Sequence, residues 1–80
     1  MNKEEIKVIL LNCFKINGID IDYINNETNL ATYIPDSLMF LSIVVTIEDS
    51  FNIRLPDELL LSEAFTKSEI LINAIAELTH

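Results

Sequence analysis

A serine that follows an aspartate, Asp36-Ser37, is the place in this sequence where residue type and context best suit chemistry. The Asp36 carboxylate can accept hydrogen bonds from the free backbone N–H groups of a first helical turn, so we expect a helix to begin at Ser37. The Ser37 hydroxyl would then point into water. A phosphate on that hydroxyl would lie at a helix N-terminus, where free amides and the helix dipole favour negative charge. Taken alone, however, Asp-Ser-Leu fits simple helix capping better than a modification site.

The other residue types that catalysis needs are missing around this serine. A nucleophilic serine requires a base within hydrogen-bond reach, but the single histidine is the last residue, His80, and Asp36 is better placed to cap than to take a proton. The sequence contains no Gly-x-Ser-x-Gly, no phosphate loop and no Cys/His metal spacing. Asp20, Asp22 and Glu27 could hold a cation weakly, although solvated loop acids are the simpler interpretation. We therefore expect neither an enzyme nor a metal site.

Composition indicates a small acidic domain. The 80 residues suffice for one domain, 1–80, with ample hydrophobic residues for a core. The single cysteine, Cys13, excludes an internal disulfide and is expected to be a buried, inert thiol. A net charge of −8 opposes nucleic-acid binding, and it suits basic partner surfaces or solubility alone. The N-terminus does not resemble an export signal, and the apolar run 38–47 is about half the roughly 20 residues of a membrane span, so we expect a cytoplasmic monomer without membrane contact.

Hydrophobic periodicity predicts an all-α fold that starts with a helix over Lys3–Ile16. Asn2 is expected as its N-cap, with Glu5 in the first turn, and Gly18 as the left-handed residue at its end. A long loop over 19–35 follows, in which a short helical turn or strand-like piece near 19–24 would fit the pattern. We expect the apolar residues of this loop to hold it against the core: Ile19, Ile21, Tyr23, Ile24, Leu30, Tyr33 and Ile34.

Three further helices are expected. The second runs from Ser37 to about Ser50, and a short third runs from Pro56 to about Leu61, with the proline at its start. Thr66-Lys67-Ser68-Glu69 matches a capping box that would begin a fourth helix, ending near Thr79. The core stripe of this last helix is predicted from its three- and four-residue spacing: Leu71, Ala74, Ile75 and Leu78.

The second helix is apolar on two sides. We assign one stripe to the core: Phe40, Ile43, Val44, Ile47 and Phe51. A second stripe, Leu38, Leu41 and Val45, is turned away from the first, and a helix buried on one side does not need it. Either the first helix or the long loop covers this second stripe, or it is a docking face for partner proteins. We favour docking for Leu38 and Val45.

The residues after Ser37 resemble the carrier-protein family, which comprises acyl, peptidyl and D-alanyl carrier proteins. An Asp-Ser-Leu opens the second helix in that family, and Phe51, Ile53, Leu55 and Pro56-Asp57 match its later positions without a gap. The resemblance implies a four-helix bundle in which Ser37, beside the N-cap Asp36, carries a covalent 4′-phosphopantetheine arm. It also implies that acyl intermediates are held on the arm as thioesters. The implied partners are a phosphopantetheinyl transferase, an acyl-loading ligase or acyltransferase, and a synthase or other acyl-processing enzyme.

The same resemblance suggests where partners dock and which pathway they serve. The family positions that meet partners are here Leu38, Met39, Leu41, Ser42, Val45, Glu48 and Asp49. Family acyl carriers usually have acids at the positions of Met39 and Ser42, so we expect a specialised pathway (polyketide, nonribosomal or other secondary biosynthesis) rather than bulk fatty-acid synthesis. A D-alanyl or aminoacyl carrier is one alternative, and a small helical interaction module without a prosthetic group is another. Whether cargo enters a loosened core beside Phe40, Ile43 and Ile47 or remains in solvent stays open.

Overall fold

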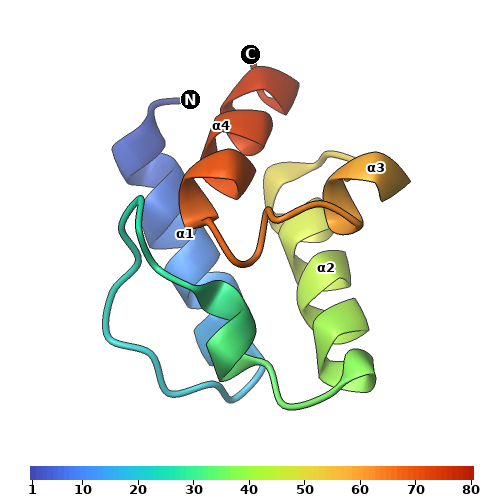
Figure 1. Cartoon of the computed structure of the whole chain (residues 1–80). Coiled ribbons are helices and arrows are strands. Elements are labelled where there is room, and N and C mark those ends of the chain that lie inside the picture. Colours follow the sequence, from blue (N-terminus) through green and yellow to red (C-terminus); the bar gives the residue numbers. More distant parts are fainter.

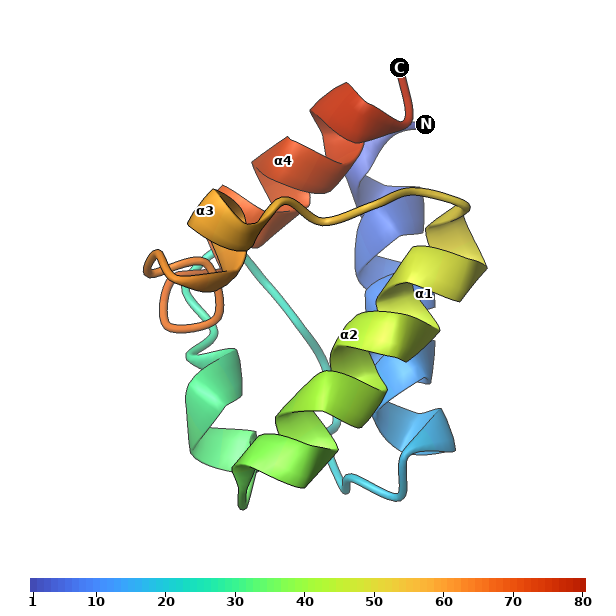
Figure 2. The same cartoon turned by 90° about the vertical axis from the view of Figure 1, so that its right-hand side faces the viewer.

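Four α-helices make up the computed structural model, which describes residues 1–80. They are α1 (Lys3–Ile16), α2 (Ser37–Phe51), α3 (Asp57–Leu60) and α4 (Ser68–Leu78), and a short 3₁₀ helix, η1 (Leu30–Tyr33), precedes α2. The structure has no strand. α1 packs against both α2 and α4, and α3 is the short helix between α2 and α4 along the chain (Figures 1 and 2). The prediction of an all-α bundle with three longer helices, one short helix and a long loop is confirmed.

Local sequence explains where the first two helices begin and end. At the start of α1, the Asn2 side chain accepts from the backbone N–H of Glu5 at 2.8 Å, and the Glu5 carboxylate accepts from the N–H of Asn2, a complete capping box. Gly18 follows the helix with φ of 81°, the left-handed conformation expected of it. α2 continues to Phe51 and ends at Asn52, whose φ of 55° is also left-handed. Asparagine tolerates this conformation better than most residues.

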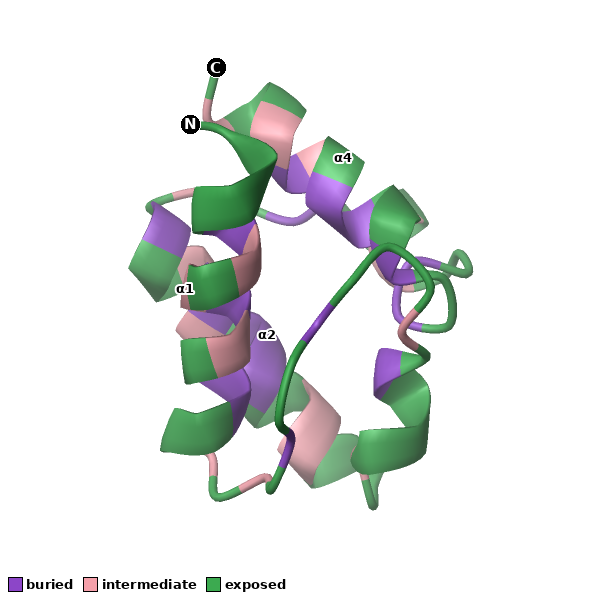
Figure 3. Cartoon of the chain, turned by 90° about the vertical axis from the view of Figure 1, so that its left-hand side faces the viewer, coloured by how far each residue is buried: buried purple, intermediate pink, exposed green.

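A single cluster of 17 buried side chains forms the core. Figure 3 shows the buried residues of α1 and α4 on the sides of these helices that face the interior. Ile43 and Ile47 of α2 have no exposed surface, in agreement with their predicted stripe. In α4 the prediction needs correction, because Leu78 is 44% exposed near the end of the helix, whereas Ile72, which the predicted stripe omitted, is fully buried.

The long connection from Asn17 to Asp36 crosses the molecule twice. From the end of α1 it runs to the beginning of α4, then returns through η1 to the beginning of α2 (Figures 1 and 2). Ile21, Ile24 and Leu30 are buried, as predicted. Tyr23 and Tyr33 are 66% and 42% exposed, so the prediction that they hold the loop to the core was wrong. A phenol hydroxyl costs free energy to bury without a partner, which favours the exposed position.

Residues 19–24 of this connection form neither a helical turn nor a strand, and its one helical turn lies later, in η1. The predicted capping box at the start of α4 is wrong as well. α4 begins at Ser68, and the residue in the N-cap position is Lys67, which makes no side-chain capping bond. The Ser68 hydroxyl is buried and donates to the backbone carbonyl of Asn25 instead. A tertiary contact with the long connection therefore replaces the expected local cap.

The Cys13 thiol is buried in the core, with 1% of its surface exposed, and donates to the Ser50 hydroxyl at 3.4 Å. Burial raises its pKa, because the charged thiolate is disfavoured away from water, and the bond to Ser50 opposes this effect only in part. This agrees with the expectation of an inert thiol. No helix has both the length and the apolar character needed to cross a membrane.

Candidate functional site at the beginning of α2

Ser37 is the first residue of α2, and its side chain is exposed. Asp36 adopts an extended backbone, and its carboxylate accepts from the N–H of Met39 at 2.8 Å while its carbonyl accepts from the N–H of Phe40 at 3.1 Å. Asp36 is therefore the N-cap, as predicted. Helix geometry leaves the N–H groups of Ser37 and Leu38 without an intrahelical acceptor. The site thus joins an accessible hydroxyl to two backbone donors and the positive end of the helix dipole.

Electrostatics at this end of α2 suit a negatively charged group. The first turn of the helix contains no acidic side chain, so Asp36 is the only carboxylate within it or capping it. Free N–H groups and the dipole at a helix N-terminus attract phosphate. A phosphate ester on the Ser37 hydroxyl would be compatible with these surroundings, because the hydroxyl is open to solvent and no core side chain has to move.

Backbone hydrogen bonds fix the segment that precedes Ser37. Within η1 and its end, the N–H of Ile34 donates to the carbonyl of Ala31 at 3.1 Å, and the N–H of Ala31 donates to the carbonyl of Phe65 at 2.9 Å. The ring of Phe65 packs edge-on against that of Phe40, with centroids 5.0 Å apart and an interplanar angle of 67°. The segment after α3 therefore contacts the chain both before and after Ser37, which sets the direction in which α2 begins.

The second apolar stripe of α2 is exposed. Leu38, Leu41 and Val45 keep 78%, 57% and 55% of their surface, so neither α1 nor the long connection covers them. Met39, also predicted to dock, is half-buried and packs against the core cluster. Three apolar side chains beside the serine are therefore left uncovered by the folded chain, which makes this side of α2 a candidate contact surface.

Three polar residues of α2 were also predicted to meet partners, and two of them have partners inside the chain. The Ser42 hydroxyl donates to the side-chain oxygen of Asn17 at the end of α1. The Glu48 carboxylate accepts from the N–H of Leu55 at 2.8 Å, which fixes the turn after α2. Asp49 is exposed. Of the three, Asp49 is the acid that remains open to a partner.

The sequence prediction missed Asn17. Its side-chain nitrogen donates to the carbonyl of Cys13 at 2.8 Å and to the hydroxyl of Thr46 at 3.0 Å, while its oxygen accepts from Ser42. Asn17 therefore joins the end of α1 to two successive turns of α2. Periodicity marked Asn17-Gly18 only as a helix end. The signal that could have found the contact is the pair of hydroxyl residues, Ser42 and Thr46, four apart in the otherwise apolar stretch 38–47.

Other candidate chemistry is not assembled by the fold. Asp20, Asp22 and Glu27 do not come together as a group of metal-binding side chains. His80 is exposed at the end of the chain, beyond α4, and belongs to a different part of the structure from the beginning of α2 (Figure 1). The structure therefore brings together Asp36, Ser37 and the apolar stripe, and places His80 elsewhere.

An exposed serine at the first position of the second helix, directly after its N-cap aspartate, in a small four-helix bundle, is the arrangement expected of a carrier protein. A family model described as a phosphopantetheine attachment site matches residues 10–66. Because this match covers more than half of the chain, the protein belongs to the phosphopantetheine-dependent carrier-protein family. Domains of this family are sites of covalent 4′-phosphopantetheine attachment. Comparisons with curated proteins and with solved structures gave no significant match.

Proposed function

We propose that Ser37 is the residue that bears 4′-phosphopantetheine, and that residues 1–80 form one carrier domain. One observation carries the proposal. Ser37 is the exposed first residue of α2, capped by Asp36, inside the region that matches the attachment-site model. A separate transferase supplies the group from coenzyme A. The Ser37 oxygen forms a bond to the phosphorus bearing the pantetheine part, the phosphoanhydride bond breaks, the nucleotide leaves, and the hydroxyl proton passes to a base of the transferase.

When bound, the group supplies a terminal thiol that holds an acyl group as a thioester. The contribution of the chain is to fix one end of that group at a rigid helix start, so that the cargo is tethered rather than free. Tethering raises the effective concentration of the cargo at each partner's active site. The chain itself is not catalytic in this proposal, since no base lies beside Ser37 in the sequence except the capping Asp36.

We propose a docking surface made of Leu38, Leu41, Val45 and Asp49, beside the attachment serine. The support is that the three apolar side chains stay more than half exposed, and the acid is free of the contacts that occupy Ser42 and Glu48. The partners would be the transferase, a ligase or acyltransferase that loads the arm, and a synthase or other acyl-processing enzyme. Met39 adds a partly buried apolar contact at the edge of this surface.

The chemistry of the same surface also supports a proposal about the pathway that the protein serves. Near the serine the helix offers Met39 and a Ser42 hydroxyl already bonded to Asn17, rather than acids, so partner recognition there is mainly apolar. We infer a carrier for a specialised biosynthetic pathway, with D-alanyl or aminoacyl cargo as the second candidate. Loading assays of the modified protein with acyl, D-alanyl and aminoacyl ligases would decide between these cargos.

The attachment is tested by intact-mass spectrometry after coexpression with a broad-specificity phosphopantetheinyl transferase. We expect the wild-type chain to gain the mass of one phosphopantetheine and Ser37→Ala to gain none. Ser42→Ala, which removes another serine of α2, is the matched control and should still be modified. A folded wild-type protein that gains no mass beside an active transferase would contradict the proposal. That result would favour a helical interaction module in which Ser37 only begins the helix.

A further inference from the structure

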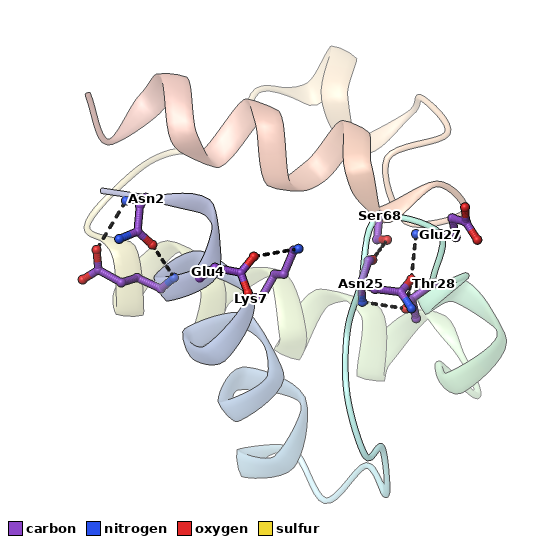
Figure 4. Close-up of polar contacts among 8 residues, drawn as sticks. Asn2, Glu4, Lys7, Asn25, Glu27, Thr28 and Ser68 are labelled. Carbon is purple, nitrogen blue, oxygen red and sulfur yellow. Dashed lines mark hydrogen bonds and ion pairs between the residues drawn. The ribbon is translucent and has the colours of Figure 1, made fainter.

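The beginning of α4 is bound to the long connection rather than capped by its own side chains. The N–H of Ser68 donates to the carbonyl of Thr28 at 3.2 Å, and the N–H of Glu69 donates to the carbonyl of Asn26 at 3.1 Å. The Ser68 hydroxyl, fully buried, donates to the carbonyl of Asn25 (Figure 4). Ser68 is also the one polar residue among the 18 buried residues of the chain. A polar group kept in a core in this way is bound to a specific partner, because an unpaired one would be costly.

The segment that these bonds hold is itself a closed turn. The N–H of Asn25 donates to the Thr28 hydroxyl at 2.9 Å, and the N–H of Glu27 donates to the Asn25 side-chain oxygen at 2.8 Å. The Thr28 hydroxyl donates to the same Asn25 oxygen at 3.2 Å, so the side chains of residues 25 and 28 lock the turn (Figure 4). Ser68 therefore anchors a preformed unit rather than a loose strand of backbone.

The contacts of Ser68 are connected to Ser37 in two ways, through the segment that precedes Ser37 and through the first turn of α2 that follows it. One residue separates Thr28 from η1, and the Ala31 N–H of η1 donates to the carbonyl of Phe65, three residues before Ser68. The Phe65 ring then packs against Phe40, in the first turn of α2. The contacts at the start of α4 thus hold both the chain entering Ser37 and the first turn that leaves it.

We propose that Ser68 is a positioning residue for the modification of Ser37. Its buried hydroxyl keeps the segment 25–36 in one conformation, so that the transferase meets a helix start that is already formed. A protein in which only a fraction of molecules has the competent conformation binds more weakly by that fraction. Loss of the anchor should therefore act on recognition of the chain and leave the rate of the bound complex unchanged. The inference rests on Ser37 being the attachment residue.

The test compares Ser68→Ala with Ser68→Thr, which keeps the hydroxyl. For Ser68→Ala we expect the KM of the transferase for this protein to rise by up to about tenfold, the full effect of one lost hydrogen bond, with kcat unchanged. Ser68→Thr should restore most of the wild-type KM. Ile72→Val, a buried change in the same helix that removes none of the hydrogen bonds to residues 25–28, is the control for lost stability and should leave KM within about twofold of wild type.

Hydrogen exchange on the unmodified proteins supplies a readout that does not depend on Ser37. Ser68→Ala should increase the exchange rates of the Ala31 and Ile34 amides by a larger factor than those of the amides in the interior of α1. If Ser68→Ala fails to fold, Thr28→Val, which unlocks the turn without touching the core serine, should produce the same rise in KM. An unchanged KM in a folded Ser68→Ala protein, or an equal rise in Ile72→Val, would overturn the positioning role. Failure of the wild-type protein to be modified would instead contradict the proposed function, while the exchange result still tests the anchor.

Discussion

The inner and outer faces of α2 are both apolar, but only one of them is covered. Ile43 and Ile47 on the inner face have no exposed surface, whereas Leu38 and Val45 on the outer face keep 78% and 55% of theirs. Burial of an apolar side chain stabilises the fold in proportion to the area removed from water. The outer side chains therefore contribute little to folding, and they can contribute to binding when a partner covers them. The contrast separates the residues that pack α2 against the core from the residues that α2 exposes to solvent.

The largest effect that distinguishes the two faces is expected on the inner one. Ile47→Ala should lower the free energy of unfolding by about 2–5 kcal/mol, through lost transfer energy and the cavity left behind. Urea denaturation followed by circular dichroism would measure it. A loss below about 1 kcal/mol would contradict this expectation. It would mean that the core collapses to fill the cavity, which a tightly packed interior does not do.

A smaller loss of stability is expected from a change at the N-cap of α2, which belongs to neither face. Asp36→Ala removes the side-chain acceptor of the Met39 N–H and should lower the free energy of unfolding by about 1 kcal/mol. Asp36→Asn keeps an acceptor in the same place and should lose only a few tenths. The same denaturation measurement applies. If the two variants were equally destabilised, the carboxylate charge rather than the capping hydrogen bond would be the stabilising feature.

The smallest effect on stability is expected on the outer face. Val45→Ala should change the free energy of unfolding by no more than about 0.5 kcal/mol, yet slow processing by a partner enzyme by up to about tenfold, the cost of two methyl groups left uncovered. Val8→Ala is the matched control, since Val8 is also an exposed valine, on α1, with 68% of its surface in solvent. Leu38→Ala should behave as Val45→Ala does. A stability loss close to that of Ile47→Ala would show that Val45 packs in the core.

Features set by neighbouring residues were predictable from the sequence. The bounds of α1 and the capping roles of Asn2 and Asp36 depend on contacts within one or two helical turns, and the inner stripe of α2 is marked by the three- and four-residue spacing of its apolar side chains. The exposed position of Ser37 followed from the same local geometry. The carrier-family resemblance came from the serine and the spacing that follows it, and the family model supports it over residues 10–66.

Features set by distant contacts were not predictable in this way. Thr66 to Glu69 carry the residues of a capping box, but α4 starts at Ser68, because backbone carbonyls about 40 residues earlier satisfy its first N–H groups. Ser42 looked free to meet a partner, but Asn17 binds it. In each case a short polar side chain had several geometrically acceptable partners, and only the folded chain selects among them. Whether Leu38, Leu41, Val45 and Asp49 meet partners stays a prediction.

The two ends of the chain lie side by side at the top of the bundle, whereas α2 begins at the bottom (Figure 1). A fluorescent protein or a surface linker joined at either terminus would therefore leave from the side opposite Ser37, the proposed attachment residue. Such a fusion would not block the access of a transferase to the Ser37 hydroxyl. The domain can therefore be immobilised, or joined in series with other copies, while Ser37 of each copy stays accessible. This geometry makes the protein a suitable unit for tandem fusions in which one modifying enzyme acts on the same serine of each copy.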